Sequence, residues 1–395
     1  MSEYQYYEFV VVDRPLTQQQ QLELRSKSSR ATISSGSFVN EYHWGDLKGD
    51  PLDWMQRYFD AHVYSANWGS CRLMLRLPRE TLEAGLLAPF ITPSASGTRT
   101  GFSQIFSAQE NTDHWILDWD FHDDSGDCER FWSEDDGPGW MGRLLPLRDE
   151  LLRGDTRPLY LGWLARVSTG EFDDHELEPP LPAGLSTLSP AQQALAEFLL
   201  IDPDWLSAAA AGSPALPAQQ AGQEDVHLES WLLEQTETDM RATLRLLLTG
   251  RSLEAERNVR SAYLAWQRSR LIAPSPPKHR HIAQIREGVA SARAQRLEDE
   301  RLAREAKAAR QRAEYAVILE RLVQEAPQVW QEIDATVQRG TGSAYEQAFK
   351  LLTTLAEALK QAGQEADFRH GLSQLLARHG HRPAWMKRIE KARWI

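Results

Sequence analysis

The first 180 residues contain short segments in which apolar and polar side chains alternate. Residues 6–12 are aromatic and β-branched, and residues 37–44 and 71–77 place apolar side chains at every second position. Such segments are typical of β-strands. We expect residues 102–108 and 114–121 to form two more strands, and we expect the arginine-bearing face of the 71–77 strand to be solvated.

Segments with helical spacing separate these strands. Thr17 is placed to cap a helix over residues 18–28, because its hydroxyl can accept a first-turn N–H. Asp50 and Pro51 begin a second helix, in which apolar side chains recur every three or four residues as far as Val63. The alternation of strands and helices predicts an α+β domain over residues 1–180, with a mixed or antiparallel sheet and flanking helices.

The remainder of the chain is predicted to be all-α. We expect a helical region at residues 186–272, a proline-rich linker at 273–278, a long charged helix at 279–325 and a small helical unit at 326–395. Within the first of these, residues 207–221 are rich in Ala, Gly, Pro and Gln, which predicts a loose surface segment.

The long charged segment contains no proline and is dominated by good helix formers, which predicts one continuous helix over residues 282–324. Between Arg293 and Arg312, only Leu297 and Leu302 continue the apolar stripe, and a spacing of five does not maintain a coiled-coil heptad. We therefore expect the middle of this helix to be exposed and stabilised by charge pairs four residues apart.

Composition narrows the class of protein. The chain has 395 residues and a mean hydropathy of −0.51, and no apolar run is long enough to span a bilayer, so we do not expect a membrane protein. The N-terminal residues lack the basic and apolar regions of a secretory signal. Two cysteines, Cys71 and Cys128, are too few for a disulfide scaffold or a four-cysteine zinc site, so a cytoplasmic location is expected.

The net charge of −12 is unevenly distributed. Residues 110–155 contain 14 acidic and 4 basic side chains, whereas residues 278–312 contain 10 basic and 5 acidic side chains. The overall acidity disfavours broad phosphate binding, but the basic segment leaves a local nucleic-acid contact open. If that segment binds a nucleic acid or a partner protein, the side chains expected to do so are Arg293, Arg296, Arg304 and Arg310.

Residues 114–124 carry the strongest chemical signal. A strand would place His114, Asp118, Asp120 and His122 on one face. Carboxylates and imidazoles grouped in this way can bind Mg²⁺, Mn²⁺ or Zn²⁺, and Asp118, Asp120 and His122 could serve a metal-dependent hydrolase. We favour the alternative of a polar strand face beside an acidic loop, because a single strand rarely supplies a complete set of ligands.

The sequence contains no other catalytic or cofactor-binding pattern of high specificity. The serines lack a G-x-S-x-G context, and no phosphate-binding glycine fingerprint or Walker-type lysine is present. We therefore expect no cofactor, and the sequence leans toward a protein that is not an enzyme without deciding the question.

Two parts of the chain resemble bacterial families. YYEF at residues 6–9, DRPL at 13–16, SFVNEYHWGD at 37–46 and ANWG at 66–69 resemble an uncharacterised bacterial protein family over about the first 165 residues. This resemblance implies no catalytic residues. The C-terminal tail is similar to the helical tail of bacterial SWIM zinc-finger proteins, although the zinc-binding cysteines are absent. It implies a shared docking element, with a SWIM zinc-finger protein or a Swi/Snf-type helicase as the partner.

Three classes of function are consistent with these patterns. The first, which we favour, is a non-enzymatic interaction or scaffold protein of a multi-protein bacterial system. The second is a nucleic-acid accessory factor that works with a helicase. The third is a metal-dependent hydrolase that uses the acidic and histidine-rich segment at residues 114–124.

Overall fold

The computed structural model describes residues 3–93, 105–122, 130–131, 137–216, 223–270, 279–392 and 394. The chain forms two compact units, Met1–Gln295 (unit 1) and Arg296–Ile395 (unit 2). The predicted linker at residues 273–278 and the start of the predicted strand at 102–108 lie outside the described residues. None of the described helices combines the length and the apolar composition needed to cross a bilayer.

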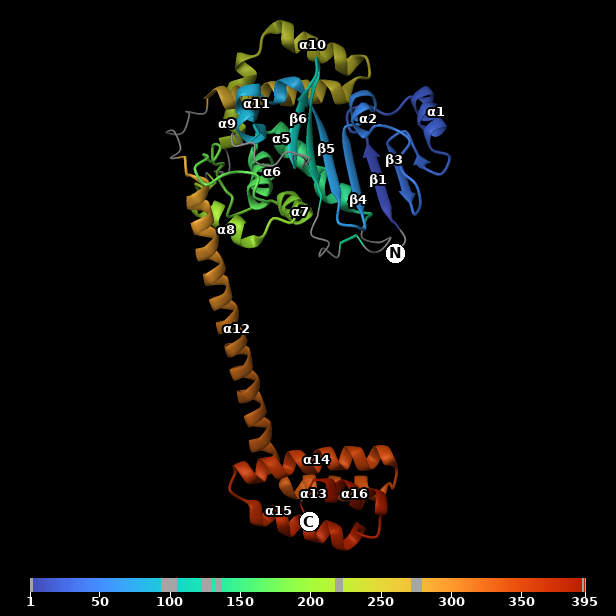
Figure 1. The fold of residues 1–395 in the computed structure, drawn as a ribbon, viewed down its shortest axis with the longest axis vertical. Helices are drawn as coiled ribbons and strands as arrows, with labels where there is room; N and C mark the ends of the chain where they lie inside the picture. Colours follow the sequence, from blue (N-terminus) through green and yellow to red (C-terminus); the bar gives the residue numbers. More distant parts are fainter. Residues whose placement is uncertain are drawn as a thin grey trace. The chain divides into compact units, whose positions relative to one another are not determined.

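Unit 1 is built on a seven-stranded sheet in the order β2-β3-β1-β4-β5-β7-β6 (Figure 1). Every neighbouring pair of strands is antiparallel, so the predicted α+β class is confirmed. The strands are β1 (Gln5–Val10), β2 (Thr32–Ile33), β3 (Ser37–Tyr42), β4 (Ala61–Ala66), β5 (Cys71–Pro78), β6 (Phe106–Glu110) and β7 (His114–Phe121).

One face of the sheet carries the larger hydrophobic core. Alternate residues of the central strands, such as Val63, Leu75 and Leu117, pack there against helices. The elements of this part of unit 1 are η1 (Arg79–Thr81), α3 (Ala84–Ile91), α4 (Trp140–Leu144), α5 (Pro146–Leu152), α6 (Arg157–Ser168), α7 (Pro190–Phe198) and α8 (Pro203–Gly212).

The opposite face carries a smaller core beneath α1 (Gln18–Lys27) and α2 (Pro51–Arg57). Leu24 and Trp54 of these helices pack against the strand residue Phe9 and its neighbours. The Thr17 side chain accepts a hydrogen bond from the first turn of α1, which confirms the predicted cap.

The second predicted helix is shorter than expected, because α2 ends at Arg57 and β4 begins at Ala61. His62 and Val63 therefore lie in the middle of the sheet. The apolar spacing that predicted a helix continues from α2 into β4 because β4 is buried on both faces. A short buried strand has the same apolar content as a helix segment.

The arginine-bearing face of β5 is covered, contrary to the prediction of a solvated face. Arg76 is buried, and its Nε and one terminal nitrogen donate to Oδ1 of Asp60 at 3.0 and 2.6 Å. The other Asp60 oxygen accepts from the backbone N–H groups of Val12 and Asp13. This ion pair lets a buried arginine lie beneath the α2 region without an unpaired charge.

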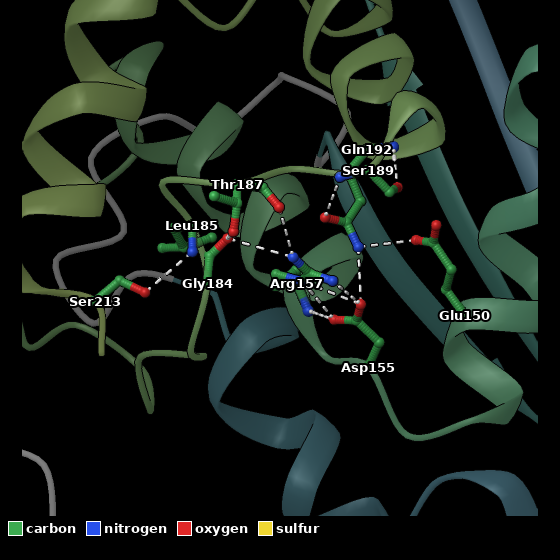
Figure 2. Close-up of polar contacts among 9 residues, drawn as sticks. All are labelled: Glu150, Asp155, Arg157, Gly184, Leu185, Thr187, Ser189, Gln192 and Ser213. Atoms are coloured by element: carbon green, nitrogen blue, oxygen red, sulfur yellow. Dashed lines mark hydrogen bonds and ion pairs between the residues drawn. The ribbon is translucent and has the colours of Figure 1, made fainter. Parts of the chain in front are cut away.

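The helices after residue 185 do not begin a separate domain, which differs from the predicted division at residues 180–186. Figure 2 shows polar contacts at this point. Arg157, at the start of α6, pairs with Asp155 and donates to the Thr187 carbonyl, and Gln192 of α7 also donates to Asp155. Helices α6 and α7 belong to the same hydrophobic core as the sheet.

One further prediction in this region is corrected. Residues 203–212 form α8, with Ala208 and Ala209 buried, so the alanine-rich stretch is not loose over that part. The helical region predicted at residues 186–272 contains a break near Thr236, whose side chain caps the next helix. The elements are α9 (Gln223–Glu234), α10 (Glu237–Leu248) and α11 (Ser252–Arg270).

The predicted long helix is confirmed as α12 (Ile282–Gln324), a continuous helix of 43 residues. Ile282 and Ile285 in its first turns are fully buried in the core of unit 1. Residues 294–307 are exposed throughout, as predicted. The helix begins in unit 1 and ends in unit 2.

Unit 2 is a small helical unit with its own core. Residues such as Ile333, Leu352, Leu372 and Trp385 form this core. Gly363 has a φ of 73° and follows the helix that ends at Gln361, as expected of a glycine that ends a helix. The helices are α13 (Ala326–Gln338), α14 (Gly342–Gln361), α15 (Glu365–His379) and α16 (Pro383–Lys391).

Candidate functional site

Strand β7 brings together three of the four candidate metal ligands. Asp118 and Asp120 lie on the same face of the strand, and His122 follows directly after its last residue, Phe121. His114 lies four residues before Asp118, which is roughly 13 Å along a strand. It lines a different cavity of about 880 Å³, so it is not part of the same cluster.

Asp118 is held by Arg72 of β5. The Arg72 Nε donates to Oδ1 at 2.9 Å, and a terminal nitrogen donates to Oδ2 at 2.6 Å. Burial raises the pKa of the Asp118 carboxyl, and the Arg72 guanidinium opposes this shift. Because both carboxylate oxygens face the guanidinium, the side chain serves an ion pair within the sheet.

Asp120 and His122 belong to a series of polar contacts that ends at Ser70. The His122 Nε2 lies 3.2 Å from Oδ1 of Asp120, and its Nδ1 lies 3.0 Å from Oγ of Ser70. A serine, a histidine and a carboxylate in series are the components of a nucleophilic hydrolase. However, Ser70 is only 5% exposed, so its hydroxyl has little access to a substrate.

The described residues do not complete a metal site. Asp123 and Asp124, the last two acidic residues of the predicted segment, lie outside them. Within the part of the chain that the structure describes, no group of three or more His, Cys, Asp or Glu side chains is arranged to hold a metal ion. The metal-dependent hydrolase therefore stays a prediction without support from this geometry.

His62 is a buried titratable residue beside this cluster, and the sequence analysis placed it in a helix. Its ring is fully buried and stacks on Phe9, with 3.8 Å between ring centroids, and its Nδ1 lies 3.0 Å from the Glu8 carbonyl. Burial lowers the pKa of His62 to about 3, so the imidazole is neutral at physiological pH. Its role in the structure is to pack in the sheet.

The cavity beside His114 lies at the other end of β7. Several of its charged lining residues are already paired, including Arg79 with Glu110 at 2.6 Å and Arg251 with Glu254. Burial lowers the pKa of His114, and the positive charge of Arg76 adds to this shift. A cavity lined by both signs of charge in internal pairs selects no particular class of ligand.

The candidate arginines of α12 have acidic neighbours. Arg293 pairs with Asp202 and Asp204 in unit 1, at 3.5 and 3.3 Å. Farther along the helix, Arg296 pairs with Glu300 and Arg310 with Glu314, whereas Arg304 donates to the Glu300 carbonyl. These are the charge pairs expected of an exposed helix, and they interrupt the predicted basic face.

The sequence analysis did not identify an apolar surface on α10. Met240, Leu244, Leu247 and Leu248 are 49%, 56%, 47% and 87% exposed. Their spacing of four, seven and eight residues places them on one face of the helix, and α10 has no buried residue. The spacing is visible in the sequence, but it predicts an amphipathic helix without showing whether its apolar face is covered.

Comparison with known proteins adds no further evidence. The chain gives no significant match to protein-family models, to curated proteins or to solved structures. The exposed face of α10 and the ion pairs of β7 and α12 are therefore the features from which a function can be inferred.

Proposed function

We propose that this chain is a non-enzymatic interaction protein and that α10 carries its docking surface. The observation that carries this proposal is the row of four exposed apolar side chains on one face of a well-formed helix. Apolar side chains that recur at these intervals are the anchors by which amphipathic helices bind apolar partners. Contiguous exposed apolar patches are typical of interaction sites.

Energetics favour a covered state for this surface. Full burial of a leucine or methionine side chain contributes roughly 1.5–3 kcal/mol relative to exposure. While the four side chains of α10 are exposed to water, a large part of this free energy of burial is not gained. A partner that covers them recovers it, and the ordering cost is small because α10 is already helical.

The polar residues of β7 support this proposal over an enzyme. Both carboxylate oxygens of Asp118 are engaged by Arg72, and Ser70 is buried. The polar side chains of this cluster, Ser70, Arg72, Asp118, Asp120 and His122, therefore interact with one another.

Site-specific photo-crosslinking tests the proposal. A benzophenone amino acid at Leu244 of the full chain, expressed in its native host, is expected to form an adduct with a defined protein. The same probe at Leu22, which is 65% exposed on α1, is the matched control. The partners implied by the tail resemblance, a SWIM zinc-finger protein or a Swi/Snf-type helicase, are the first to be sought among the adducts.

The purified partner should bind the wild-type chain and lose binding to a Leu244→Asp/Leu247→Asp variant. Absence of any adduct at position 244, or equal adducts at positions 22 and 244, would contradict the proposal. Unchanged binding by the double variant would contradict it as well.

A further inference from the structure

We propose that the partner of the α10 surface is α10 of a second copy of this chain, packed antiparallel across a twofold axis. The inference rests on the proposed function, because it names the occupant of the same apolar surface. Helix α10 lies at the outside of unit 1 (Figure 1), and among the described residues its four apolar side chains are left about half exposed or more.

The order of charges along α10 selects this occupant. The first turn is acidic, with Glu237 and Asp239, and the following turns are basic, with Arg241 and Arg245. Two parallel copies would place acidic turns together and basic turns together. Two antiparallel copies place the acidic turn of one helix against the basic turns of the other, so the surface is complementary to itself.

The lateral positions of these charges agree with the pairing. At 100° per residue, Glu237 falls at the edge of the apolar row beside Leu248, and Arg241 and Arg245 continue along the flank next to it. That flank meets its own copy when two helices pack antiparallel, which brings Glu237 of one chain toward Arg245 of the other. Glu237 and Arg241 already form an exposed pair within one helix at 2.6 Å, and they remain available for exchange at the interface.

Symmetry and dipoles add two physical reasons. A twofold interface uses the same patch on both chains and closes after two copies, so no apolar face is left over. Antiparallel helices also place the positive end of each helix dipole beside the negative end of the other.

Sedimentation equilibrium of the full chain tests this inference. The wild-type protein and the control Leu22→Asp are expected to form dimers with the same dissociation constant. Leu244→Asp/Leu247→Asp is expected to weaken the dimer by roughly tenfold or more. Circular dichroism of each variant verifies that the helices are retained, which is expected because all substituted side chains are exposed.

Charge reversal tests the orientation. Glu237→Arg and Arg245→Glu are each expected to weaken the dimer, and the combination is expected to restore it. Pairing of Glu237 with Arg245 of the second copy places the twofold axis near residue 241, so a Met240→Cys chain should form a covalent dimer on oxidation. A Leu22→Cys chain with the same native cysteines should not. In a parallel pair, the double variant would bind no more tightly than either single variant. That result would overturn the antiparallel arrangement.

The outcomes for the two proposals are distinct. A monomeric wild-type chain that still crosslinks from position 244 to a different protein would overturn the second-copy inference and leave the interaction function in place. A monomeric chain that forms no adduct from position 244 would overturn both.

Discussion

Arg72 of β5 and Asp118 of β7 face each other across two neighbouring strands and share two hydrogen bonds, at 2.9 and 2.6 Å. Asp118 is directly opposite Met74 in the register, so the arginine reaches it diagonally from two residues away. Asp118, one of the candidate metal ligands predicted from residues 114–124, therefore stabilises the pairing of β5 with β7.

Removal of the Asp118 carboxylate should destabilise unit 1. Asp118→Ala leaves the guanidinium of Arg72 without its partner in a mostly buried position, and loss of one member of such a pair costs about 3 kcal/mol. Urea unfolding of unit 1 measures this change. The double variant Arg72→Met/Asp118→Leu removes both charges and should lose less stability than Asp118→Ala.

The same variants separate this role from metal binding. We expect EDTA or added Mn²⁺ to leave the stability of the wild-type chain unchanged. Mn²⁺ binding by the wild-type chain that disappears in Asp118→Asn and in Asp120→Asn would instead support the hydrolase.

Stability of unit 1 should depend on pH through His62. The pKa of His62 is about 3 in the folded chain and about 6.5 in an unfolded chain. Between these values the unfolded state binds a proton that the folded state excludes, so His62 favours folding fully above pH 6.5 and progressively less as the pH falls toward 3. Over this range the folding equilibrium constant should fall by up to roughly tenfold for each pH unit.

Hydrogen exchange of the strands of unit 1, recorded over that pH range, measures the effect without a contribution from unit 2. His62→Leu should flatten the pH dependence, whereas His175→Gln at an exposed position should retain it. An unchanged slope in His62→Leu would refute the assignment to this residue.

The sequence was sufficient where one local pattern determines the structure. The alternation from His114 to His122 predicts β7, and the helix formers after Ile282 predict α12, because each pattern extends over several turns or residue pairs. Helical spacing failed at Val63, since a strand buried on both faces has no polar alternation to reveal it.

The functional features were harder to predict because they depend on partners that are distant in the chain. The sequence around Asp118 is the same whether its carboxylate binds a metal ion or pairs with Arg72, which lies 46 residues away. The apolar positions of α10 are equally regular whether the face is covered or open. Only the packing of α10 against α11 shows which side chains remain exposed.

The start of α12 should be anchored by Glu178. Its carboxylate accepts from Arg280 at 2.7 and 2.8 Å and from the buried Tyr160 hydroxyl. Glu178→Leu leaves the Arg280 guanidinium without its carboxylate and the Tyr160 hydroxyl without this acceptor, and should destabilise unit 1 by about 3 kcal/mol in urea unfolding. The matched control is Glu298→Leu in the exposed pair with Arg301, which should change stability little. Equal effects of the two substitutions would contradict a buried anchor.

Gly162 of α6 should be required for the packing of this helix on the sheet. A Cβ at this position would lie 2.6 Å from atoms of Phe106 and of Trp119, both fully buried. Gly162→Ala is therefore expected to destabilise unit 1 by about 1–3 kcal/mol, despite the higher helix propensity of alanine. Gly142→Ala in α4 meets no atom within 4 Å and should be neutral or stabilising, as measured by thermal unfolding.

The exposed middle of α12 should not bind nucleic acid through its arginines. Arg296 and Arg310 each pair with a glutamate four residues later, and Arg304 is bonded to the backbone of the same helix. Their charge is therefore partly neutralised before any phosphate approaches, and an acidic chain gives weak non-specific affinity. Mobility-shift titrations of labelled duplex DNA and RNA over a range of salt concentrations measure this directly.

Reversal of these three charges, in Arg296→Glu/Arg304→Glu/Arg310→Glu, should leave the titrations unchanged, as should the control Arg321→Glu beyond this segment. Phosphate contacts made by these side chains would have a specific signature. The wild-type chain would bind with an affinity that falls steeply with salt, and the triple variant would lose both the affinity and most of its salt dependence, because each phosphate contact releases counterions. That result would contradict the prediction and favour a nucleic-acid accessory factor, with α12 as its contact surface.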